Sequence, residues 1–314
     1  MPRLRVLSLG AGVQSTALLL LSAQGRLPRF DAALFADTGW EPRRVYEHLE
    51  RLEREVAQPA GIPIYRVRAK SAGAQRVSGD LRADSLEPGA FVRVPVFVRD
   101  RVGTGAAMVR RQCTEEYKLK PLKFKIREML GYPHPKPVPR GVVVEQAIGI
   151  SRDEFERAKD AGVRYLHNVF PLLDLDGAAD GRAGWTREDC KRYLRSHGWG
   201  TTPKSACIGC PFHGNAQWRE LRDEHPEEWA DAVDFDHRMR QTRLRGIKEA
   251  PFLHRSLLPL DVAPIDRVTR SEWAQRQGDL FDSLADEEAE EGASLGCSPW
   301  GCRGQDPSAE VGAA

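Results

Sequence analysis

The residues with the clearest capacity for chemistry are two cysteines separated by two positions, Cys207 and Cys210. Their thiolates are soft ligands that suit zinc or an iron–sulfur cluster, and a Cys-x-x-Cys pair can also form a redox disulfide. Cys113, far upstream, is a third candidate ligand, and His213 could complete a zinc set with the three cysteines. The pattern therefore predicts a metal or redox site whose identity stays open among these possibilities.

A glycine-rich loop near the amino terminus is the second candidate site. Residues 8–16 read Ser-Leu-Gly-Ala-Gly-Val-Gln-Ser-Thr and follow a predicted strand. Gly10 and Gly12 are expected to adopt backbone conformations that other residues resist, so that successive N–H groups converge on an anion at the start of the next helix. Hydroxyl groups come from Ser8, Ser15 and Thr16. The alternative interpretation is a glycine turn that only packs a strand against a helix.

The elements that must position these residues alternate between strand and helix. Short apolar runs predict strands at 4–9, 30–36, 62–67, 141–150 and 165–172. Helices are expected at 15–23, after Pro42 and at 187–194. This alternation favours an α/β fold, a Rossmann-like parallel sheet with helices on both faces. Ligands of such sheets bind beyond the carboxyl ends of the strands, where the glycine loop, residues 37–39 and residues 149–152 all fall.

Composition and charge suggest three parts along the chain. We expect a nucleotide-binding α/β domain over 1–215, a helical carboxyl-terminal extension over 216–277 that acts as a cap, and an acidic flexible tail over 278–314. The loop-rich segment 71–105 is expected to pass over the site. No apolar run approaches the roughly 18 residues of a membrane span, and no signal peptide is apparent, so we expect a cytoplasmic protein without a membrane partner.

Several short segments, taken in order, resemble a known family. They are the loop at 10–15, residues 35–40 with 45–47, 113–122, 149–152, 170–174 with 185–189, and 207–211. The loop is similar to Ser-Gly-Gly-x-Asp-Ser, residues 37–39 to an Asp-Thr-Gly segment, and 113–122 to a Cys-Cys…Lys-x-x-Pro-Leu segment. Together they resemble the phosphoadenosine phosphosulfate (PAPS) reductase-like family of the adenine nucleotide α-hydrolase (PP-loop) superfamily. The resemblance covers residue 4 to about residue 215.

The resemblance implies a set of site residues. An adenine nucleotide, either ATP or adenylyl sulfate, would be bound by Ser8, Gly10, Gly12, Gln14, Ser15, Thr16, Asp37, Thr38 and Gly39, with Lys118 and Arg152 on a phosphate or sulfate. A [4Fe–4S] cluster, preferred here over zinc, would be held by Cys113, Cys207 and Cys210. Its fourth iron would bind a tail cysteine, or stay open to sulfide or substrate. The tail cysteines Cys297 and Cys302 are the candidate catalytic nucleophiles.

Three departures from the family pattern limit what the resemblance implies. Gln14 stands where ATP-cleaving members use an acidic residue near Mg²⁺, and Thr114 replaces the second cysteine of the Cys-Cys pair. The tail offers Cys297 and Cys302 in place of the family's Glu-Cys-Gly-Leu-His sequence. The remaining cysteine, Cys190, occupies an apolar position of a predicted helix and is expected to be a buried small hydrophobe.

Three functions remain open on this basis. The first is reduction of an adenylyl sulfate compound through a cysteine nucleophile, with a thioredoxin-like reductant as partner. The second is ATP-dependent adenylation and thiolation of a substrate such as a nucleic-acid base, and the third is a nucleotide-binding protein without turnover. The net charge of +2 gives no global preference for nucleic acid. The basic run 110–127 would be a solvated helix face or, if used as a whole, a guide for a nucleic-acid backbone.

Overall fold

The computed structural model describes residues 2–71, 77–100, 105–109, 112–269 and 272–273, and the acidic tail with Cys297 and Cys302 lies outside them. The described residues form two compact units. The first, called the sheet unit here, contains the chain up to Lys70 together with Thr114–Ser205. The second unit contains Ser71–Cys113 and the described residues of 206–273. This division differs from the expected boundary at residue 215, because segment 71–113 packs with the carboxyl-terminal part of the chain.

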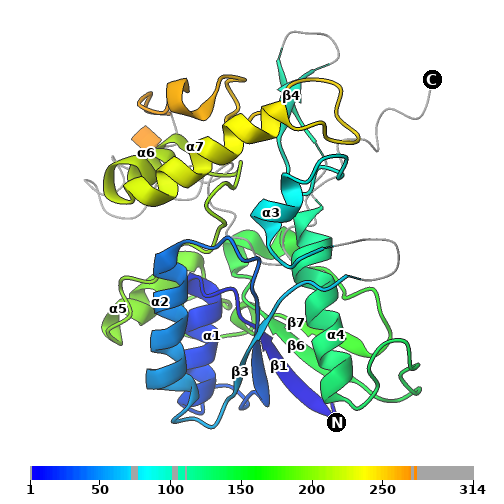
Figure 1. The fold of residues 1–314 in the computed structure, drawn as a ribbon. Coiled ribbons are helices and arrows are strands. Elements are labelled where there is room, and N and C mark those ends of the chain that lie inside the picture. Colours follow the sequence, from blue (N-terminus) through cyan, green and yellow to red (C-terminus); the bar gives the residue numbers. More distant parts are fainter. Residues whose placement is uncertain (1, 72–76, 101–104, 110–111, 270–271, 274–314) are drawn as a thin grey trace, which may run out of the picture. The chain divides into compact units, whose positions relative to one another are not determined.

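Five parallel strands form the centre of the sheet unit, as the sequence predicts (Figure 1). The strands are β1 (Leu4–Ser8), β2 (Ala32–Ala36), β3 (Ile64–Val67), β6 (Val144–Ile148) and β7 (Leu166–Val169). Their order across the sheet is β3-β2-β1-β6-β7. Each lies within its predicted segment, and the sheet with its flanking helices confirms a Rossmann-like α/β fold.

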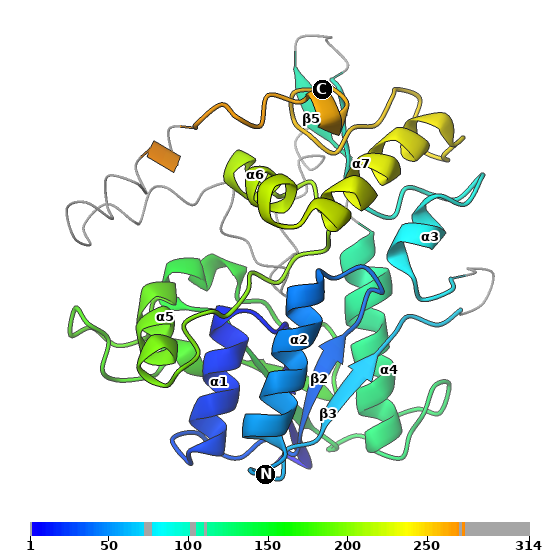
Figure 2. The same cartoon turned by 60° about the vertical axis from the view of Figure 1, so that its left-hand side comes forward.

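Helices cover both faces of this sheet (Figures 1 and 2). One face packs against α1 (Val13–Ala23), α2 (Arg43–Leu52), the π-helical turn Glu53–Ala57 and α5 (Arg187–Ser196). The opposite face packs against α4 (Lys120–Met129), which follows the π-helical turn Thr114–Leu119. Neighbouring strand residues alternate between the two cores, as Leu7 and Val6 do, because successive side chains of a strand point to opposite faces.

The winding direction of the sheet reverses between β1 and β6. Strands β2 and β3 lie on one side of β1, whereas β6 and β7 lie on the other. The glycine loop follows β1, and Gly149 follows β6. Parallel α/β sheets bind ligands at such a switch point, outside the carboxyl ends of the strands. The fold therefore places the glycine loop where a ligand site is expected.

The second unit contains a short hairpin and two longer helices. Its elements are α3 (Leu81–Ser85), the antiparallel pair β4 (Phe97–Arg99) and β5 (Ala106–Met108), α6 (Asn215–Glu224), α7 (Pro226–Gln241) and the 3₁₀ turn Leu260–Val262. Arg82 in α3 forms an ion pair of 2.7 Å with Asp231 in α7. Phe97 and Phe252 exchange two backbone hydrogen bonds of 2.8 Å. These contacts explain why segment 71–113 belongs to this unit.

Two features of the helices were not expected from the sequence. The predicted helical extension begins with two separate helices, α6 and α7, because Pro226 starts a new helix where an intact one would need its N–H. Residues after the strands β6 and β7 form the 3₁₀ turns Arg152–Arg157 and Pro171–Leu173. In the described part of the chain, every helix is too short or too polar to cross a membrane.

Candidate functional site

The glycine loop is closed by hydrogen bonds of its own residues. The N–H of Gly10 donates to Ser15 Oγ at 3.2 Å, and this hydroxyl donates to the carbonyl of Gly12 at 3.2 Å. The N–H of Thr16 donates to the same carbonyl at 2.9 Å, which starts α1. Ser15 therefore shapes the loop from within, and its hydroxyl has two partners without any ligand.

The conformational demand in the loop falls on an alanine. Ala11 has a φ of 56°, in the left-handed region, whereas Gly12 is extended with φ −104° and ψ −179°. The expectation that Gly10 and Gly12 carry the unusual conformations is thus wrong. Ala11 is fully buried in the core on the α1 side of the sheet, so its methyl group contributes packing that a glycine would lack.

Gly149 is required by a close approach of two backbones. A Cβ atom at this position would lie 2.8 Å from the nitrogen of Ser15 and 2.9 Å from the Cβ of Gln14. Both contacts are shorter than real Cβ atoms make, and the first is with backbone, which cannot rotate away. The chain leaving β6 therefore packs directly on the first turn of α1, and this contact fixes one wall of the site.

A cavity of about 40 Å³, called the loop cavity here, lies over the loop. It is lined by Ser8, Gly10, Gly12, Val13, Gln14, Ser15, Gly149, Glu154, Arg157, Arg187, Lys204 and Ser205. Ser8 is 4% exposed, and its Oγ has no hydrogen-bond partner among the described residues. No described side chain caps the amino terminus of α1 either. These are groups that an anion of the size of one phosphate would satisfy.

Three basic residues of this lining were missed by the sequence interpretation: Arg157, Arg187 and Lys204. Arg157 lies on the 3₁₀ turn after β6, and Arg187 begins α5. Lys204 lies in the loop between α5 and α6. Only Arg157 follows a strand closely enough for the strand-end rule to have indicated it. The other two are brought to the loop by tertiary packing.

A carboxylate also lines the loop cavity. Glu154 is buried, accepts a hydrogen bond of 3.3 Å from Gln14 Nε2 and pairs with Arg157 at 2.7 Å. Gln14 Nε2 also contacts Ser151 Oγ at 3.4 Å. The loop itself has no acidic residue, because Gln14 stands where the resembled family has one. Glu154 supplies a carboxylate to the loop cavity from another segment. Carboxylate and phosphate oxygens suit Mg²⁺, so Glu154 is the residue that would hold this ion.

Residues 37–39 form a separate turn at the end of β2. Asp37 accepts hydrogen bonds from the Gly39 N–H at 2.8 Å, the Tyr46 hydroxyl at 2.8 Å and Arg68 Nε at 2.7 Å. Burial, together with the neighbouring Asp37, raises the pKa of Tyr46. Thr38 Oγ1 donates to Glu41 at 3.0 Å. The described lining of the loop cavity does not include this turn, so its role in binding adenine or sugar stays a prediction.

Lys118 and Arg152, the predicted phosphate ligands, lie apart from the described lining of the loop cavity. Lys118 is buried, with its Nζ 3.9 Å from Glu41 Oε1. Arg152 pairs with Asp180, to which its NH1 donates at 3.2 Å. Both cations pair with carboxylates outside the described lining, whereas Arg157, Arg187 and Lys204 are the basic residues of that lining.

Thr16 turns its hydroxyl away from the loop. Thr16 Oγ1 lies 3.0 Å from His48 Nε2, and both residues are buried. Burial, and then the charge of Arg51, lowers the pKa of His48 to about 4, so this imidazole is neutral near pH 7. The edge of His48 contacts Trp199, with ring centroids 5.6 Å apart. The hydroxyl of Thr16 therefore connects α1 to α2. The backbone N–H of Thr16 contacts the glycine loop, through its hydrogen bond to Gly12.

The three predicted cysteine ligands all belong to the second unit. Cys113 and Cys207 are buried and Cys210 is half-buried. The N–H of Cys210 donates to the carbonyl of Cys207 at 3.1 Å, and His213 Nε2 lies 3.0 Å from the same carbonyl. Cys190, in contrast, is fully buried in the core of the sheet unit, as predicted, and burial raises the pKa of its thiol.

Zinc makes a geometric demand that these cysteines do not meet. Zn–S bonds of about 2.3 Å in a tetrahedron place the sulfur atoms roughly 3.8 Å apart. Cys113, Cys207, Cys210 and His213 do not form a group in which all ligand atoms lie within 4.8 Å of one another. A [4Fe–4S] cluster spreads its cysteines over different iron atoms and needs wider spacing. The cluster and the zinc set therefore both stay predictions.

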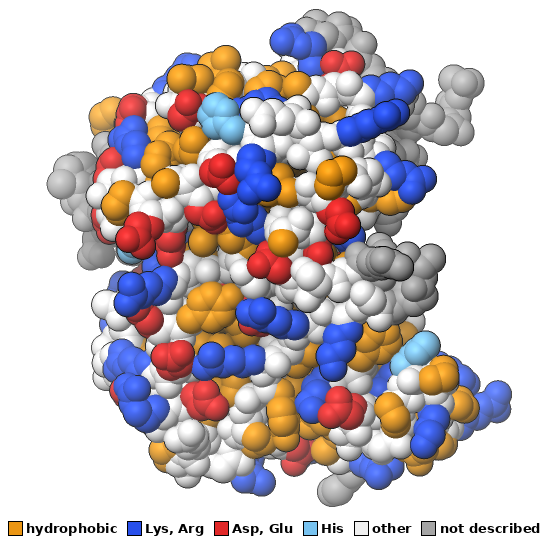
Figure 3. Space-filling model, viewed as in Figure 1, with side chains coloured by type: hydrophobic (Ala, Val, Ile, Leu, Met, Phe, Trp, Pro, Cys, Tyr) orange, Lys and Arg blue, Asp and Glu red, His pale blue; other side chains and the backbone are white. Residues whose placement is uncertain are grey.

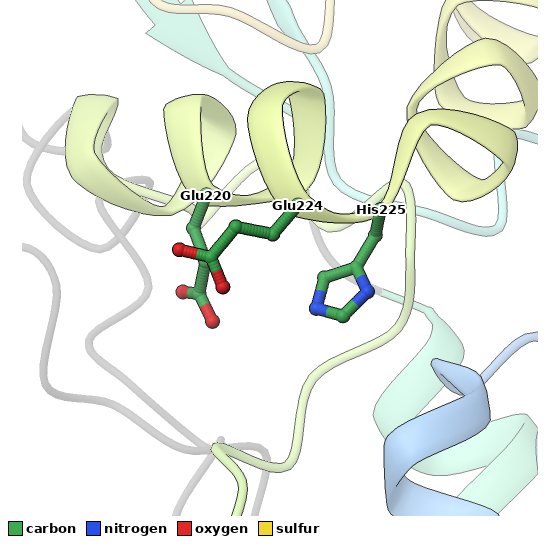
Figure 4. A group of neighbouring side chains, drawn as sticks. All are labelled: Glu220, Glu224 and His225. Atoms are coloured by element: carbon green, nitrogen blue, oxygen red, sulfur yellow. The ribbon is translucent and has the colours of Figure 1, made fainter.

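One compact group of ligand atoms does occur among the described residues, at the end of α6. Glu220, Glu224 and His225 offer atoms that all lie within 4.8 Å, and their side chains project to the same side of the helix (Figure 4). Glu220 and Glu224 are one helical turn apart, so their proximity follows from helix geometry. Glu224 is exposed, and solvent-facing groups of this kind are common without an ion.

Three cations of the basic run 110–127, Lys118, Lys120 and Lys125, pair with carboxylates. Lys120 pairs with Glu116, and Lys125 lies 2.8 Å from Glu128. Basic and acidic side chains are interspersed over the face drawn in Figure 3. These pairs support the interpretation of a solvated helix face over that of a guide for a nucleic-acid backbone, which needs a field of one sign.

Comparison with known proteins adds no assignment to this geometry. No protein-family model matches the chain, and no curated protein matches it. The resemblance to PAPS reductases therefore rests on the short motifs alone.

Proposed function

We propose that the protein is a PAPS reductase-like enzyme that binds the phosphate part of an adenine nucleotide, ATP or adenylyl sulfate, at the loop cavity. The observation that carries this proposal is the buried hydroxyl of Ser8, which lines the cavity without a partner among the described residues. A buried polar atom of this kind costs free energy unless something satisfies it. A phosphate oxygen would do so.

The rest of the lining supports an anion in particular. Arg157, Arg187 and Lys204 bring positive charge, and the amino terminus of α1 adds the positive end of the helix dipole. Glu154 is the one carboxylate of the described lining, and Arg157 partly neutralises it. The site lies at the switch point of a parallel sheet, where nucleotides bind in this architecture.

The sulfur chemistry of the proposal comes from the cysteines. Cys113, Cys207 and Cys210 would hold a [4Fe–4S] cluster, which when bound supplies iron able to bind sulfide or a thiolate. The candidate nucleophiles Cys297 and Cys302 lie outside the described residues. A second candidate function, ATP-dependent adenylation with sulfur transfer, is favoured by Glu154, because a carboxylate beside the phosphates suits the Mg²⁺ that accompanies ATP.

Two serine variants test the binding step. Ser8→Ala removes a buried hydroxyl that has no partner among the described residues, so the free energy of unfolding of the unliganded protein should not fall and should rise by about 1 kcal/mol. A hydrogen bond to a charged group contributes about 1.5–3 kcal/mol, so the affinity for ATP or adenylyl sulfate should fall by roughly tenfold or more. Calorimetric titration and urea unfolding measure the two quantities.

The matched control is Ser22→Ala in the same unit. Ser22 is buried like Ser8, but its hydroxyl donates to the carbonyl of Pro28 at 3.2 Å and accepts from the N–H of Phe30 at 3.1 Å. This variant should lower the stability by about 1 kcal/mol and leave the nucleotide affinity unchanged. Equal nucleotide affinities for wild type and Ser8→Ala would show that the loop has only a structural role.

A further inference from the structure

A second, larger cavity lies beside the loop cavity within the sheet unit. Its volume is about 220 Å³, against about 40 Å³ for the loop cavity. It is lined by Val13, Arg187, Lys191, Leu194, Arg195, Trp199, Gly200, Thr202 and Lys204. Val13, Arg187 and Lys204 also line the loop cavity, so the two spaces are neighbours with a common wall.

Positive charge dominates the lining of this second cavity. Arg187, Lys191 and Arg195 follow one another at intervals of four residues in α5 and therefore share one face of the helix, and Lys204 adds a fourth cation. Glu188 pairs with Lys191 at 3.1 Å and with Arg195 at 2.7 Å. It does not belong to the described lining, which contains four basic side chains and no carboxylate.

The aromatic residue of the second cavity, Trp199, already packs against two side chains. The guanidinium of Arg51 lies 4.0 Å from the centroid of the Trp199 ring, and His48 contacts the same indole at 5.6 Å. Trp199 is 5% exposed. A nucleotide base would need an open ring face on which to stack. The cavity therefore offers charge for recognition, and stacking contributes little.

The difference in volume matters for the proposed ligand. The loop cavity has room for a few water-sized groups, which suits a single phosphate and is too small for a di- or triphosphate. The second cavity provides the missing room, and Arg187 and Lys204 stand between the two spaces, where one cation can serve two anionic groups.

We propose that the second cavity is a phosphate subsite, which binds a further phosphate group next to the one held by the loop. This group belongs either to the same nucleotide or to a separate small co-substrate. The inference rests on the proposed function in one respect, that the loop cavity takes the first phosphate.

The test uses the double variant Lys191→Ala/Arg195→Ala, which removes two cations of the second cavity and none of the loop cavity. The affinities of ATP and AMP are measured by calorimetry. In a second arm, binding of inorganic phosphate to the ATP-saturated protein is followed by ³¹P line broadening. The matched control is Arg182→Ala/Arg192→Ala, which removes two exposed cations that belong to neither described lining.

A loss of at least tenfold in ATP affinity with unchanged AMP affinity would support a subsite for the same nucleotide. Loss of phosphate binding to the ATP-saturated protein, with ATP affinity unchanged, would support a subsite for a separate co-substrate. If the double variant and the control match wild type in both arms, the inference is overturned. A further competition compares how effectively ATP and a short single-stranded oligonucleotide displace the phosphate when both are counted in phosphate groups. More effective displacement by the oligonucleotide would also overturn the inference, because it would assign the cavity to a nucleic-acid backbone.

The same experiment separates this inference from the proposed function. If wild type binds none of ATP, AMP and adenylyl sulfate, the proposed function fails. Binding of inorganic phosphate alone can then still be measured. If Lys191→Ala/Arg195→Ala loses this phosphate binding, the second cavity is still supported as an anion site.

Discussion

The loop cavity and the cysteine segment differ in how their parts are assembled. The loop cavity is formed within one unit, and half of its described lining, from Ser8 to Ser15, comes from one continuous segment of strand, loop and helix. The cysteines come from two distant segments of the second unit, and their sulfur atoms do not form a compact group. The loop has its shape without a ligand, whereas the cysteines would need a metal cluster to define theirs.

This difference concerns which of the two sites has its shape before its ligand binds. Hydrogen bonds between the Ser15 hydroxyl and the main chain, together with the contact with Gly149, fix the loop, so its cavity exists before a phosphate arrives. Metal binding to distant ligands supplies folding free energy itself, so such ligands can be arranged by the metal. The comparison therefore predicts that loop variants change affinity, and that cysteine variants change metal content.

The largest effect is expected from Cys207→Ser, which tests the cysteine side of the comparison. Loss of a thiolate ligand should abolish bound iron, because serine is a poor ligand for iron–sulfur clusters. Protein purified without oxygen is analysed for iron and zinc and for visible absorbance. Circular dichroism should remain that of the folded sheet unit, to which Cys207 does not belong.

Cys190→Ala is the control for this experiment, since Cys190 is buried in the sheet core and is expected to bind no metal. Iron content that is the same in Cys207→Ser and wild type would remove Cys207 from the ligand set. A colourless wild-type protein with one zinc would replace the cluster by zinc and require the cysteines to move together.

The next largest effect is expected from Gly149→Ala, which tests whether the loop is held by packing. The new methyl group would lie 2.8 Å from the backbone nitrogen of Ser15, so the chain after β6 must move. Overpacking of this kind costs about 1–3 kcal/mol, which urea unfolding should detect, and nucleotide affinity should fall with it. At Gly12 an added Cβ meets Ser205 Cβ at an ordinary 3.4 Å, so Gly12→Ala should have a smaller effect on stability. Similar stabilities for the two variants would contradict the role given to Gly149.

The smallest effect is expected in the pH dependence of the stability of the sheet unit, to which His48 belongs. Burial, and then Arg51, lowers the pKa of His48 to about 4, below its value of about 6.5 in an unfolded chain. Between these values the unfolded chain binds a proton that the folded protein does not, so acidification favours unfolding. The free energy of unfolding should fall by about 2 kcal/mol between pH 7 and pH 5 on this account.

His48→Gln should remove that part of the pH dependence while keeping a polar partner for Thr16. The exposed His167 provides the control variant His167→Gln, with which the pH profile of His48→Gln is compared. If His48→Gln loses as much stability on acidification as wild type, His48 is not the buried group responsible.

Much of the sheet could be predicted from the sequence because its signals are local. Apolar runs such as Ala32–Ala36 identify the strands, and the rule on strand ends places the loop at the switch point. Arg187 and Lys204 could not be predicted as cavity residues, since packing of α5 and the loop after it brings them there. Ala11 was missed because composition indicates where glycines are, and the strained residue of the loop is not one of them.

The left-handed conformation of Ala11 has a kinetic consequence for any ligand of the loop. An alanine in this conformation costs about 1–2 kcal/mol, and its buried methyl group returns roughly 0.8 kcal/mol through contacts that exist only in this one arrangement. A loop fixed in this way does not need to be ordered when a nucleotide binds. Different nucleotides should therefore associate at similar rates, and the protein should discriminate between them by how long each one stays bound.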